Sequence, residues 1–317
     1  MVDSSQLAES KSIHRRTGRT FYYATRLLPE RVRRATYVLY AFFRVADEVV
    51  DNADGMPPEA QRRRLEEIRE AALGREETDD PVLAAFADVR EEYGIPEAEV
   101  EVFIEAMLSD IERSRYETYE ELEAYMRGSA SAVGVMMTYV MLPDDPEPAI
   151  ERARALGEAF QLTNFVRDVR EDVLDRGRIY LPLETLRGNG ATERQVEDLE
   201  YDEAFAAAVR EELARAESLY REGVAGIEYL PEGCQLPVFT AAVLYADHHR
   251  LVRELDCDVL AETPSLSRRR KFSLVARTWL HWQWQKDPEA VFARVSAVPN
   301  GATTRHGPDH GEPSVVR

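Results

Sequence analysis

Lysine is almost absent from this sequence. Of the 40 basic residues in 317, three are lysines (Lys11, Lys271 and Lys286), while 59 residues are acidic and the formal net charge is −19. A protein that binds nucleic acid needs a surplus of basic side chains to neutralise phosphates, so the composition argues against a nucleic-acid partner. So acidic a surface is typical of proteins that stay soluble in concentrated salt, where screening weakens self-repulsion. We therefore expect a halophilic, archaeal source.

Cysteine and long hydrophobic runs are scarce as well. The two cysteines, Cys234 and Cys257, provide neither a disulfide framework nor a metal-ligand spacing. The longest largely apolar run, residues 132–142, is far shorter than the ~20 residues that span a bilayer. The first ten residues are polar and lack the pattern of a signal peptide. We expect a cytoplasmic protein that contacts a membrane at most peripherally.

Helical periodicity dominates the chain, and no run rich in Val, Ile and Thr alternates as a strand does. We expect an all-α fold with one helical domain over residues 1–292, followed over residues 293–317 by a disordered acidic and polar tail without periodicity. Proline at the starts of the periodic segments and glycine or asparagine after their ends predict the helix boundaries. The predicted helices cover residues 31–50, 58–73, 81–93, 96–114, 119–141, 146–172, 181–190, 193–199, 201–227, 236–256 and 267–284.

The helix predicted over residues 31–50 carries a row of charges next to aromatic residues. Asp47 and Asp51 are four residues apart, which places two carboxylates ~6 Å apart on one helix face. Tyr40 and Arg44 lie on the same face. Like charges at this spacing destabilise a helix unless a positive group lies between them, and either Arg44 or a bound Mg²⁺ ion would serve. The alternative is an ordinary charged surface with an Arg–Asp pair.

A second row of acceptor side chains lies on the helix predicted over residues 146–172. Asn164, Asp168 and Asp172 repeat at every fourth position, with Gln161 and Glu171 on the same face. Two arginines, Arg167 and Arg170, stand beside this row, as in a site for a metal ion and a phosphorylated ligand. The apolar side of this helix carries Leu162, Phe165, Val166 and Val169. An ordinary amphipathic surface helix is the alternative.

Taken together, the two rows favour a binding site. Two helices that carry aspartates can face each other across the interior of a bundle and hold Mg²⁺ ions between them. Such ions neutralise a diphosphate and make it a better leaving group, while arginines donate charge-assisted hydrogen bonds to it. An apolar cavity below would accept a hydrocarbon tail. A polyprenyl diphosphate requires all three features, so we predict this ligand.

Six segments, in order along the chain, resemble the squalene/phytoene synthase family over roughly residues 12–280. This resemblance implies an isoprenoid-synthase-type helical bundle around a central cavity. The segments are RTFYY (19–23), Tyr40 to Asp51 with its DEVVD ending, SRY (114–116), QLTNFVRDVRED (161–172), RGRIYLP (176–182) and LPVFTAAVLY (236–245).

The resemblance also implies roles for individual residues. Tyr40 and Tyr245 would stand near the reacting carbons, where their rings would stabilise carbocations by cation–π attraction, although each is also explained as a helix-packing aromatic. The aspartates Asp47, Asp51, Asp168 and Asp172 would be catalytic as metal ligands. The implied Mg²⁺ ligands, with Mn²⁺ as an alternative ion, are Asp47, Asp51, Asn164, Asp168 and Asp172. The implied substrate contacts are Arg44, Arg167, Gln161, Arg19 and Thr20, with the Arg19 region as a flap over the diphosphates.

By the same resemblance, the reaction would be the head-to-head condensation of two geranylgeranyl diphosphates. It would pass through a cyclopropyl diphosphate to phytoene, the first step of carotenoid biosynthesis, without a nucleotide cofactor. The DEVVD, RTFYYAT and RGRIYLP forms favour this product. One alternative is a squalene synthase, which uses NADPH, or a dehydrosqualene synthase, both acting on farnesyl diphosphate. Another is a non-catalytic assembly or binding factor, although such relatives typically lose their aspartates.

Three features leave parts of this interpretation open. Arg170 stands where relatives usually have glycine, which adds a bulky positive group beside the second row. Ser131 stands where a glycine in relatives permits a helix kink next to the tail cavity, so chain-length preference depends on it. Seven arginines between residues 15 and 34 would cover the diphosphates, pair with acidic residues, or rest on an anionic membrane.

Overall fold

The computed structural model describes residues 24–51, 55–142 and 144–300, and within these ranges the chain is helical and contains no strand. The predicted all-α class is confirmed for this part of the chain. The helices are α3 (Glu30–Asp51), α4 (Pro58–Ala72), α5 (Pro81–Tyr93), α6 (Glu97–Ser109), α7 (Tyr119–Met126), the π-helical turn η1 (Arg127–Ser131), α8 (Ala132–Met141), α9 (Glu147–Arg167), α10 (Val169–Arg176), α11 (Leu183–Gly188), α12 (Glu193–Glu197), α13 (Glu203–Ala225), the 3₁₀ turn η2 (Gly226–Tyr229), α14 (Glu232–Glu254), α15 (Arg268–Trp284) and α16 (Pro288–Val295).

Local capping explains why many helices begin and end where the sequence predicts. The Asp80 carboxylate accepts hydrogen bonds from the backbone N–H groups of Val82 and Leu83 at the start of α5, and Gly94 ends that helix with a φ of +64°. At α12, Thr192 and Gln195 form a reciprocal capping box. These groups satisfy backbone donors and acceptors that a helix end leaves unpaired.

The C-terminal boundary differs from the prediction. The expected end of the domain after residue 292 falls inside α16, a short helix that the periodicity did not predict. Asp287 caps α16 by accepting a hydrogen bond from the N–H of Ala290 at 3.0 Å, and the helix buries Val291, Phe292 and Val295. The packed chain therefore extends to Val298, which is buried. The remainder of the predicted tail, residues 301–317, lies outside the described residues.

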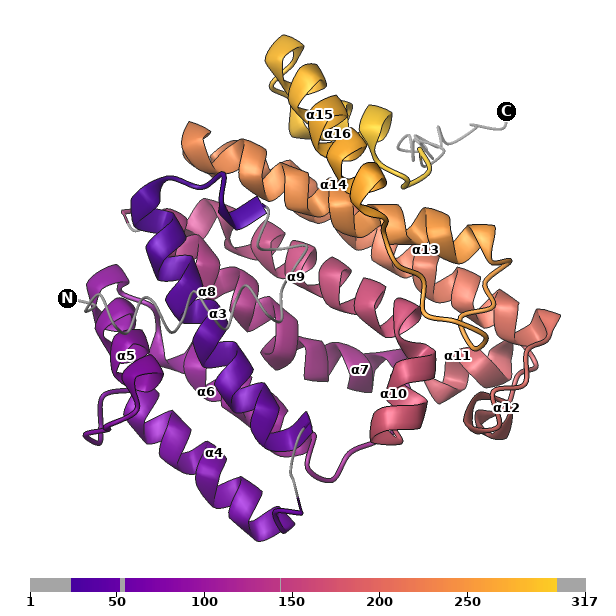
Figure 1. Cartoon of the computed structure of the whole chain (residues 1–317), viewed down its shortest axis with the longest axis horizontal. Coiled ribbons are helices and arrows are strands. Elements are labelled where there is room, and N and C mark those ends of the chain that lie inside the picture. The colour runs from indigo at the N-terminus through magenta and orange to yellow at the C-terminus, as the bar shows by residue number, and fades with distance from the viewer. Residues whose placement is uncertain (1–23, 52–54, 143, 301–317) are drawn as a thin grey trace, which may run out of the picture.

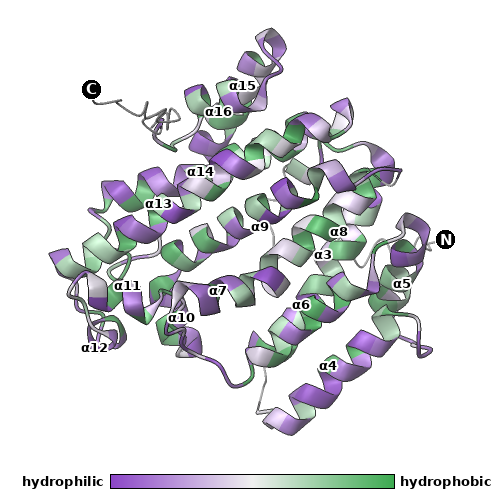
Figure 2. Cartoon of the chain, turned by 180° about the vertical axis from the view of Figure 1, so that it is seen from behind, coloured by the Kyte–Doolittle hydropathy of each residue, from purple (hydrophilic) through white to green (hydrophobic). Residues whose placement is uncertain are grey.

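Helix α9 lies at the centre of the bundle (Figure 1), in contact with α8, α13 and α14. α15 and α16 lie beyond α14, at one edge of the molecule. Close approach to α9 requires glycine. A Cβ atom on Gly223 of α13 would lie 2.6 Å from the backbone nitrogen of Leu156, and one on Gly157 would lie 2.6 Å from the carbonyl oxygen of Ala130. Figure 2 shows hydrophilic residues along much of α4, on the outside of this arrangement.

The helix predicted over residues 119–141 contains a π-helical turn, η1, at its middle. A Cβ atom on Gly128 would lie 2.4 Å from the carbonyl oxygen of Val102, so this turn packs directly on α6. Ser131 is fully buried at its end, and its hydroxyl donates a hydrogen bond to the Glu158 carboxylate. Such turns widen a helix locally. The chain thus forms an irregular turn at this point although Ser131 is not a glycine. The neighbouring Ser129 and Ala130 line the central cavity.

The fully buried Glu212 of α13 gives a prediction for the pH dependence of stability. Burial raises the pKa of Glu212 from 4.5 to about 7, although the Thr185 hydroxyl donates a 2.7 Å hydrogen bond to it. The folded state therefore holds this proton more tightly than the unfolded state, so the group destabilises the fold as pH rises from about 4.5 to 7 and remains unfavourable above that range. Glu212→Gln should raise the free energy of unfolding at pH 8 by on the order of 3 kcal/mol.

Urea unfolding at about pH 8 and at about pH 4 measures this effect, because the gain should vanish at the lower pH where both states are protonated. Glu211→Gln is the control, since Glu211 is the exposed neighbour on the same helix. A Glu212→Gln variant that is less stable than the wild type at the higher pH would contradict the prediction.

Candidate active site

The central cavity has a volume of about 540 Å³ and two chemically different ends. The C-terminal halves of α3 and α9, with α10, supply aspartates and arginines to one end. The apolar lining comes from α8, from the N-terminal half of α9, from η2 and the residue after it, and from the start of α14. Among its members are Val133, Met137, Met141, Leu156, Ile227, Leu230 and Val238.

The two aspartate rows face each other at the polar end. Asp51 at the end of α3 and Asp172 on α10 are bridged by Arg176, whose Nε lies 3.2 Å from the Asp51 carboxylate and whose Nη1 lies 3.0 Å from that of Asp172. Arg44 pairs with Asp47, and Arg167 pairs with Asp168. The juxtaposition predicted from the two rows is therefore present, and each of the four carboxylates contacts an arginine.

Arg178 completes this arrangement from the chain that follows α10. Its side chain is 9% exposed, and it donates hydrogen bonds to the Asp51 carboxylate (3.1 Å), the Tyr180 hydroxyl (3.3 Å) and the carbonyl oxygen of Asp110 (2.9 Å). We did not predict Arg176 or Arg178 as site residues. The signal was present, because two arginines follow the second acidic row within the RGRIYLP segment.

The second row does not lie on one continuous helix. Asp168 has φ −100° and ψ 12°, and it ends α9 and begins α10. The hydrogen-bond spacing nevertheless continues, because the Asp168 N–H donates to the carbonyl of Asn164 and the Asp172 N–H donates to that of Asp168, both at 2.8 Å. Asn164, Asp168 and Asp172 therefore still reach the same cavity. Backbone of this kind is frequent at active sites.

Burial and mutual repulsion raise the pKa of two of the carboxyl groups. Burial and the nearby charge of Asp51 raise the pKa of Asp47 to about 6, although 34% of its side chain stays accessible from the cavity. Burial and the charge of Asp168 raise the pKa of Asp172 to about 7. The arginines thus offset the negative charge incompletely, and a cation at this end would favour the ionised forms.

Several buried polar atoms of cavity-lining residues have no hydrogen-bond partner, among them Arg44 Nε and Asn164 Oδ1. The side-chain oxygen Oδ1 of Asn164 is buried without a hydrogen bond, and an amide oxygen of this kind is a suitable ligand for a hard cation. Among the residues that the structure describes, no group of three or more His, Cys, Asp or Glu side chains is arranged to hold a metal ion by itself. Mg²⁺ commonly uses one or two carboxylates, with water and substrate phosphates as its other ligands. The donor set therefore fits Mg²⁺ bound together with a diphosphate.

The remaining predicted residues that the structure describes also line the cavity: Tyr40, Arg44, Gln161, Arg167 and Tyr245. The Tyr245 ring packs against Phe160 at a centroid distance of 4.8 Å, and burial raises the pKa of its hydroxyl, so it stays neutral. Arg19 and Thr20 lie outside the described residues.

An aromatic wall beside the aspartates was not predicted. The rings of Phe165 and Tyr180 are stacked at 4.0 Å, and Tyr125 lies 5.9 Å from Tyr180. Phe165 is buried in the hydrophobic core, as we predicted for the apolar side of the second row, and it also lines the cavity, which we did not predict. Behind the wall, the Tyr125 hydroxyl donates a 2.7 Å hydrogen bond to Asp110, and burial raises the pKa of Asp110 to about 7. An isolated aspartate after an apolar helix gives no sequence signal for this position.

Two charged residues of the second row point elsewhere. Arg170 donates a 2.6 Å hydrogen bond to the carbonyl oxygen of Leu260 and does not line the cavity, so it adds no positive group to the site. Glu171 is exposed to solvent. Asp172 keeps its place in the row, whereas Arg170 and Glu171 do not line the cavity.

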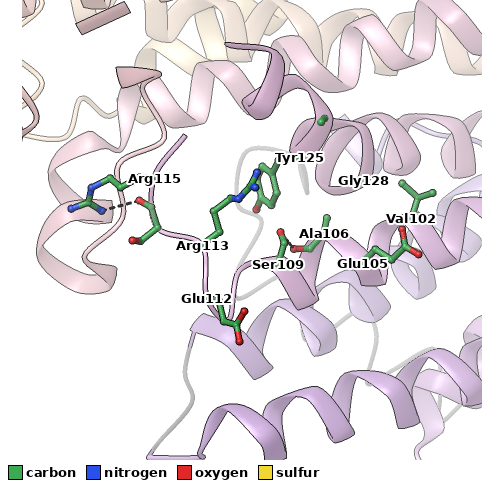
Figure 3. Close-up of a pocket in the computed structure, with 11 residues that line it drawn as sticks. Val102, Glu105, Ala106, Ser109, Glu112, Arg113, Arg115, Tyr125 and Gly128 are labelled. Carbon is green, nitrogen blue, oxygen red and sulfur yellow. Dashed lines mark hydrogen bonds between the residues drawn. The ribbon is translucent and has the colours of Figure 1, made fainter. Parts of the chain in front are cut away.

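A second hollow, of about 750 Å³, lies on the outer side of α6 and α7 (Figure 3). Tyr125 lines both cavities. The charged side chains of this hollow carry both signs and include the exposed Glu105, Glu112 and Arg113. Arg115, which also lines this hollow, donates a 2.6 Å hydrogen bond to the Glu193 carboxylate. Although this hollow has the larger volume, it lacks the opposed carboxylates of the central cavity. The central cavity is therefore the candidate active site.

Comparison with known proteins agrees with this assignment. Residues 14–273 match the family described as squalene/phytoene synthase. The chain belongs to this family. Phytoene synthase from Cereibacter sphaeroides is 34% identical over 315 residues, which cover 96% of this chain and 85% of that protein. The 15-cis-phytoene synthase from Synechocystis sp. is 33% identical over 281 residues, which cover 84% of this chain and 82% of that protein.

A solved structure of a dehydrosqualene synthase in complex with a ligand has a TM-score of 0.81 with this chain at 27% identity, covering 89% of this chain and 98% of that one. The predicted isoprenoid-synthase-type bundle around a central cavity is thereby confirmed. This family member is an enzyme of the prenyltransferase type. None of the helices described is both long and apolar enough to cross a membrane.

Proposed function

We propose that this enzyme condenses two geranylgeranyl diphosphates head to head, through a cyclopropyl diphosphate, to form phytoene. The observation that carries the proposal is one cavity with opposed aspartates and four arginines at its polar end and an apolar lining at the other. A diphosphate needs the first end and a prenyl tail needs the second. The names of the two phytoene synthases support the choice of product.

In the proposed mechanism the arginines hold the diphosphates. Arg44 and Arg167 line the cavity, and both already pair with carboxylates at its polar end. Asp47 and Asp51 on one side, and Asn164, Asp168 and Asp172 on the other, are the residues that would hold Mg²⁺. Bound Mg²⁺ would supply the positive charge that makes a diphosphate a better leaving group. With those carboxylates neutralised, Arg176 and Arg178 would be able to donate to diphosphate oxygens.

The rest of the cavity would protect the reacting carbons. Carbocations react with water, so a lining of aromatic and aliphatic side chains excludes the competing reaction. The neutral rings of Tyr40 and Tyr245 would face the cationic carbons and attract them by ~2 kcal/mol each when desolvated. Phe165 and Tyr180 would form the wall between the aspartates and the tail.

A second candidate is the formation of dehydrosqualene or squalene from farnesyl diphosphate. The similarity to the dehydrosqualene synthase structure favours it. Tail length separates the candidates, because each farnesyl chain is one isoprene unit shorter.

Product analysis tests the proposal directly. The purified protein is incubated with Mg²⁺ and either farnesyl or geranylgeranyl diphosphate, with and without NADPH, and the hydrocarbons are identified by mass spectrometry. We expect phytoene from geranylgeranyl diphosphate without NADPH. A C30 hydrocarbon as the main product from farnesyl diphosphate, with no product from the longer substrate, would overturn the proposal.

Cavity depth gives a further prediction. Ala153 lies in the N-terminal half of α9 and lines the apolar end. A phenylalanine there would fill part of the space for the last isoprene unit. Ala153→Phe should therefore lower kcat/KM for geranylgeranyl diphosphate by about tenfold or more, while any turnover of farnesyl diphosphate falls less. Steady-state kinetics with both substrates measure the ratio, and an equal loss for both would contradict this reading of the cavity.

A further inference from the structure

Helix α15 differs in charge from the rest of the chain. Five of its 17 residues are basic (Arg268, Arg269, Arg270, Lys271 and Arg277) and none is acidic, in a protein whose acidic residues outnumber its basic ones by 59 to 40. Asp247 on α14 pairs with Arg270, and Arg277 donates to a backbone carbonyl of α16. Arg268 and Arg269 are exposed to solvent.

The same helix exposes an unusual amount of aromatic surface. It buries Leu274, Thr278 and Trp282 against its neighbours. The opposite side carries four large apolar side chains that are between half and almost fully exposed: Phe272 (77%), Trp279 (53%), Leu280 (53%) and Trp284 (86%). We call these four residues, with Arg268 and Arg269, the α15 outer face. Large exposed apolar patches mark interaction sites.

The α15 outer face ends near the apolar end of the central cavity. Trp282 packs on Phe239 of α14 at a centroid distance of 5.0 Å, and Lys286 lies 3.8 Å from Glu232 at the start of α14. That start lies beside Pro29, because a Cβ atom on Gly233 would lie 2.9 Å from its ring. Leu28 and Leu230, which flank these positions, line the cavity.

Two more exposed apolar residues lie at this end. Leu27 is 50% exposed and Tyr229 is 46% exposed, and each is the chain neighbour of a cavity-lining leucine. The apolar end of the cavity therefore lies behind a surface with exposed hydrophobic side chains, next to the C-terminal end of α15. The polar end, with the aspartates, lies at the other ends of α3 and α9.

We propose that the α15 outer face docks this enzyme on the surface of an anionic lipid bilayer. Tryptophan is favoured at the boundary between headgroups and acyl chains, and arginines beside it attract anionic lipids. A second copy of this acidic chain fits less well, because two-fold pairing through this face would bring like-charged arginines together. The inference goes beyond the proposed reaction and requires only binding, so it can be tested without turnover.

All three tryptophans of the chain, Trp279, Trp282 and Trp284, lie in α15. Tryptophan fluorescence of the full chain therefore reports on this helix alone. We expect the protein to sediment with vesicles made of equal parts of phosphatidylglycerol and phosphatidylcholine, and brominated acyl chains in those vesicles to quench its fluorescence. Vesicles of phosphatidylcholine alone should bind about tenfold less protein, since each arginine near an anionic surface contributes ~1 kcal/mol.

Two double variants and a control locate the surface. Arg268→Gln with Arg269→Gln, and Trp279→Ser with Trp284→Ser, should each weaken vesicle binding about tenfold. Met56→Ser removes an apolar side chain that is 40% exposed before α4, and its binding should equal that of the wild type. Circular dichroism and thermal unfolding establish that the variants remain folded.

Three outcomes would overturn the proposal. The first is the absence of vesicle binding by the folded wild-type protein. The second is vesicle binding that both double variants retain but that is lost in a triple variant, Arg15→Gln with Arg16→Gln and Arg19→Gln. Another surface would then contact the lipid. The third is a concentration-dependent dimer in sedimentation equilibrium that Trp279→Ser with Trp284→Ser abolishes, since a second copy would then cover the face.

Discussion

Replacing Asp168 by asparagine should reduce turnover by about a thousandfold or more while the helical circular dichroism spectrum stays unchanged. Asp168 lies where α9 ends and α10 begins, pairs with Arg167 and lines the polar end of the cavity. Asparagine has the same shape but lacks the negative charge that would hold Mg²⁺. The same substitution at Asp47 should have a similar effect.

The loss of activity should not come from loss of stability. Asp168 contributes to the raised pKa of Asp172 by repulsion, so removal of one of the two charges relieves strain in the absence of metal. We therefore expect the melting temperature without Mg²⁺ to change little, because relief of this repulsion offsets the loss of the ion pair with Arg167. Mg²⁺ with inorganic diphosphate should raise the melting temperature of the wild type and have less effect on the variant.

Asp198→Asn is the matched control, because Asp198 forms an exposed ion pair with Arg194 on α12. Its turnover should remain within about twofold of the wild type, since exposed ion pairs contribute little. If Asp168→Asn keeps most of its turnover, the assignment of Asp168 as a metal ligand is wrong. If the control loses turnover as well, the loss in Asp168→Asn would reflect the removal of any acidic side chain and not a specific role of Asp168.

Arg178→Gln should lower the free energy of unfolding by about 3 kcal/mol and should also reduce turnover. The guanidinium is almost buried and donates to three acceptors, of which Asp51 and the backbone of Asp110 lie on different elements. Glutamine leaves the Asp51 carboxylate with Arg176 alone and leaves part of this buried network without a donor. Urea unfolding and steady-state kinetics measure the two effects.

The destabilisation should be larger at pH 8 than at pH 5. Burial raises the pKa of Asp110 to about 7, while the charge of Arg178 opposes the rise. At pH 5 Asp110 is neutral in the folded protein, so loss of the cation costs less, whereas at pH 8 the carboxylate needs it. Arg187→Gln, which removes an exposed ion pair with Glu117, should change the free energy of unfolding by less than ~1 kcal/mol at either pH. Equal losses of unfolding free energy in both variants would show that the buried contacts of Arg178 contribute no more to stability than an exposed ion pair.

Local sequence signals were sufficient for much of the secondary structure. The helix at residues 81–93 begins and ends where Asp80, Pro81 and Gly94 predict. The predicted first helix, 31–50, extends by one residue at each end as α3. α16 was missed because its eight residues are fewer than the window over which a helical period is recognised.

The candidate site was predicted in part. Ten of the predicted residues line one cavity: Tyr40, Arg44, Asp47, Asp51, Gln161, Asn164, Arg167, Asp168, Asp172 and Tyr245. Regular helical spacing was correct for the second row because hydrogen bonds of i to i−4 type continue across Asp168. Arg170 and Glu171 lie off the face that Asp168 and Asp172 present to the cavity, and Arg170 instead contacts Leu260.

The sequence by itself determined that the chain is helical, that two acidic rows exist and that each is accompanied by arginines, because these are properties of spacing along single helices. Which groups meet was decided by tertiary packing. Arg178 reaches Asp51 across 127 positions of sequence, Phe165 turns toward the cavity, and Asp110 enters the network behind it. The α15 outer face also depends on packing, since the contacts with α14 and α16 determine which side of that helix remains exposed. Such contacts between distant segments leave no period in the sequence.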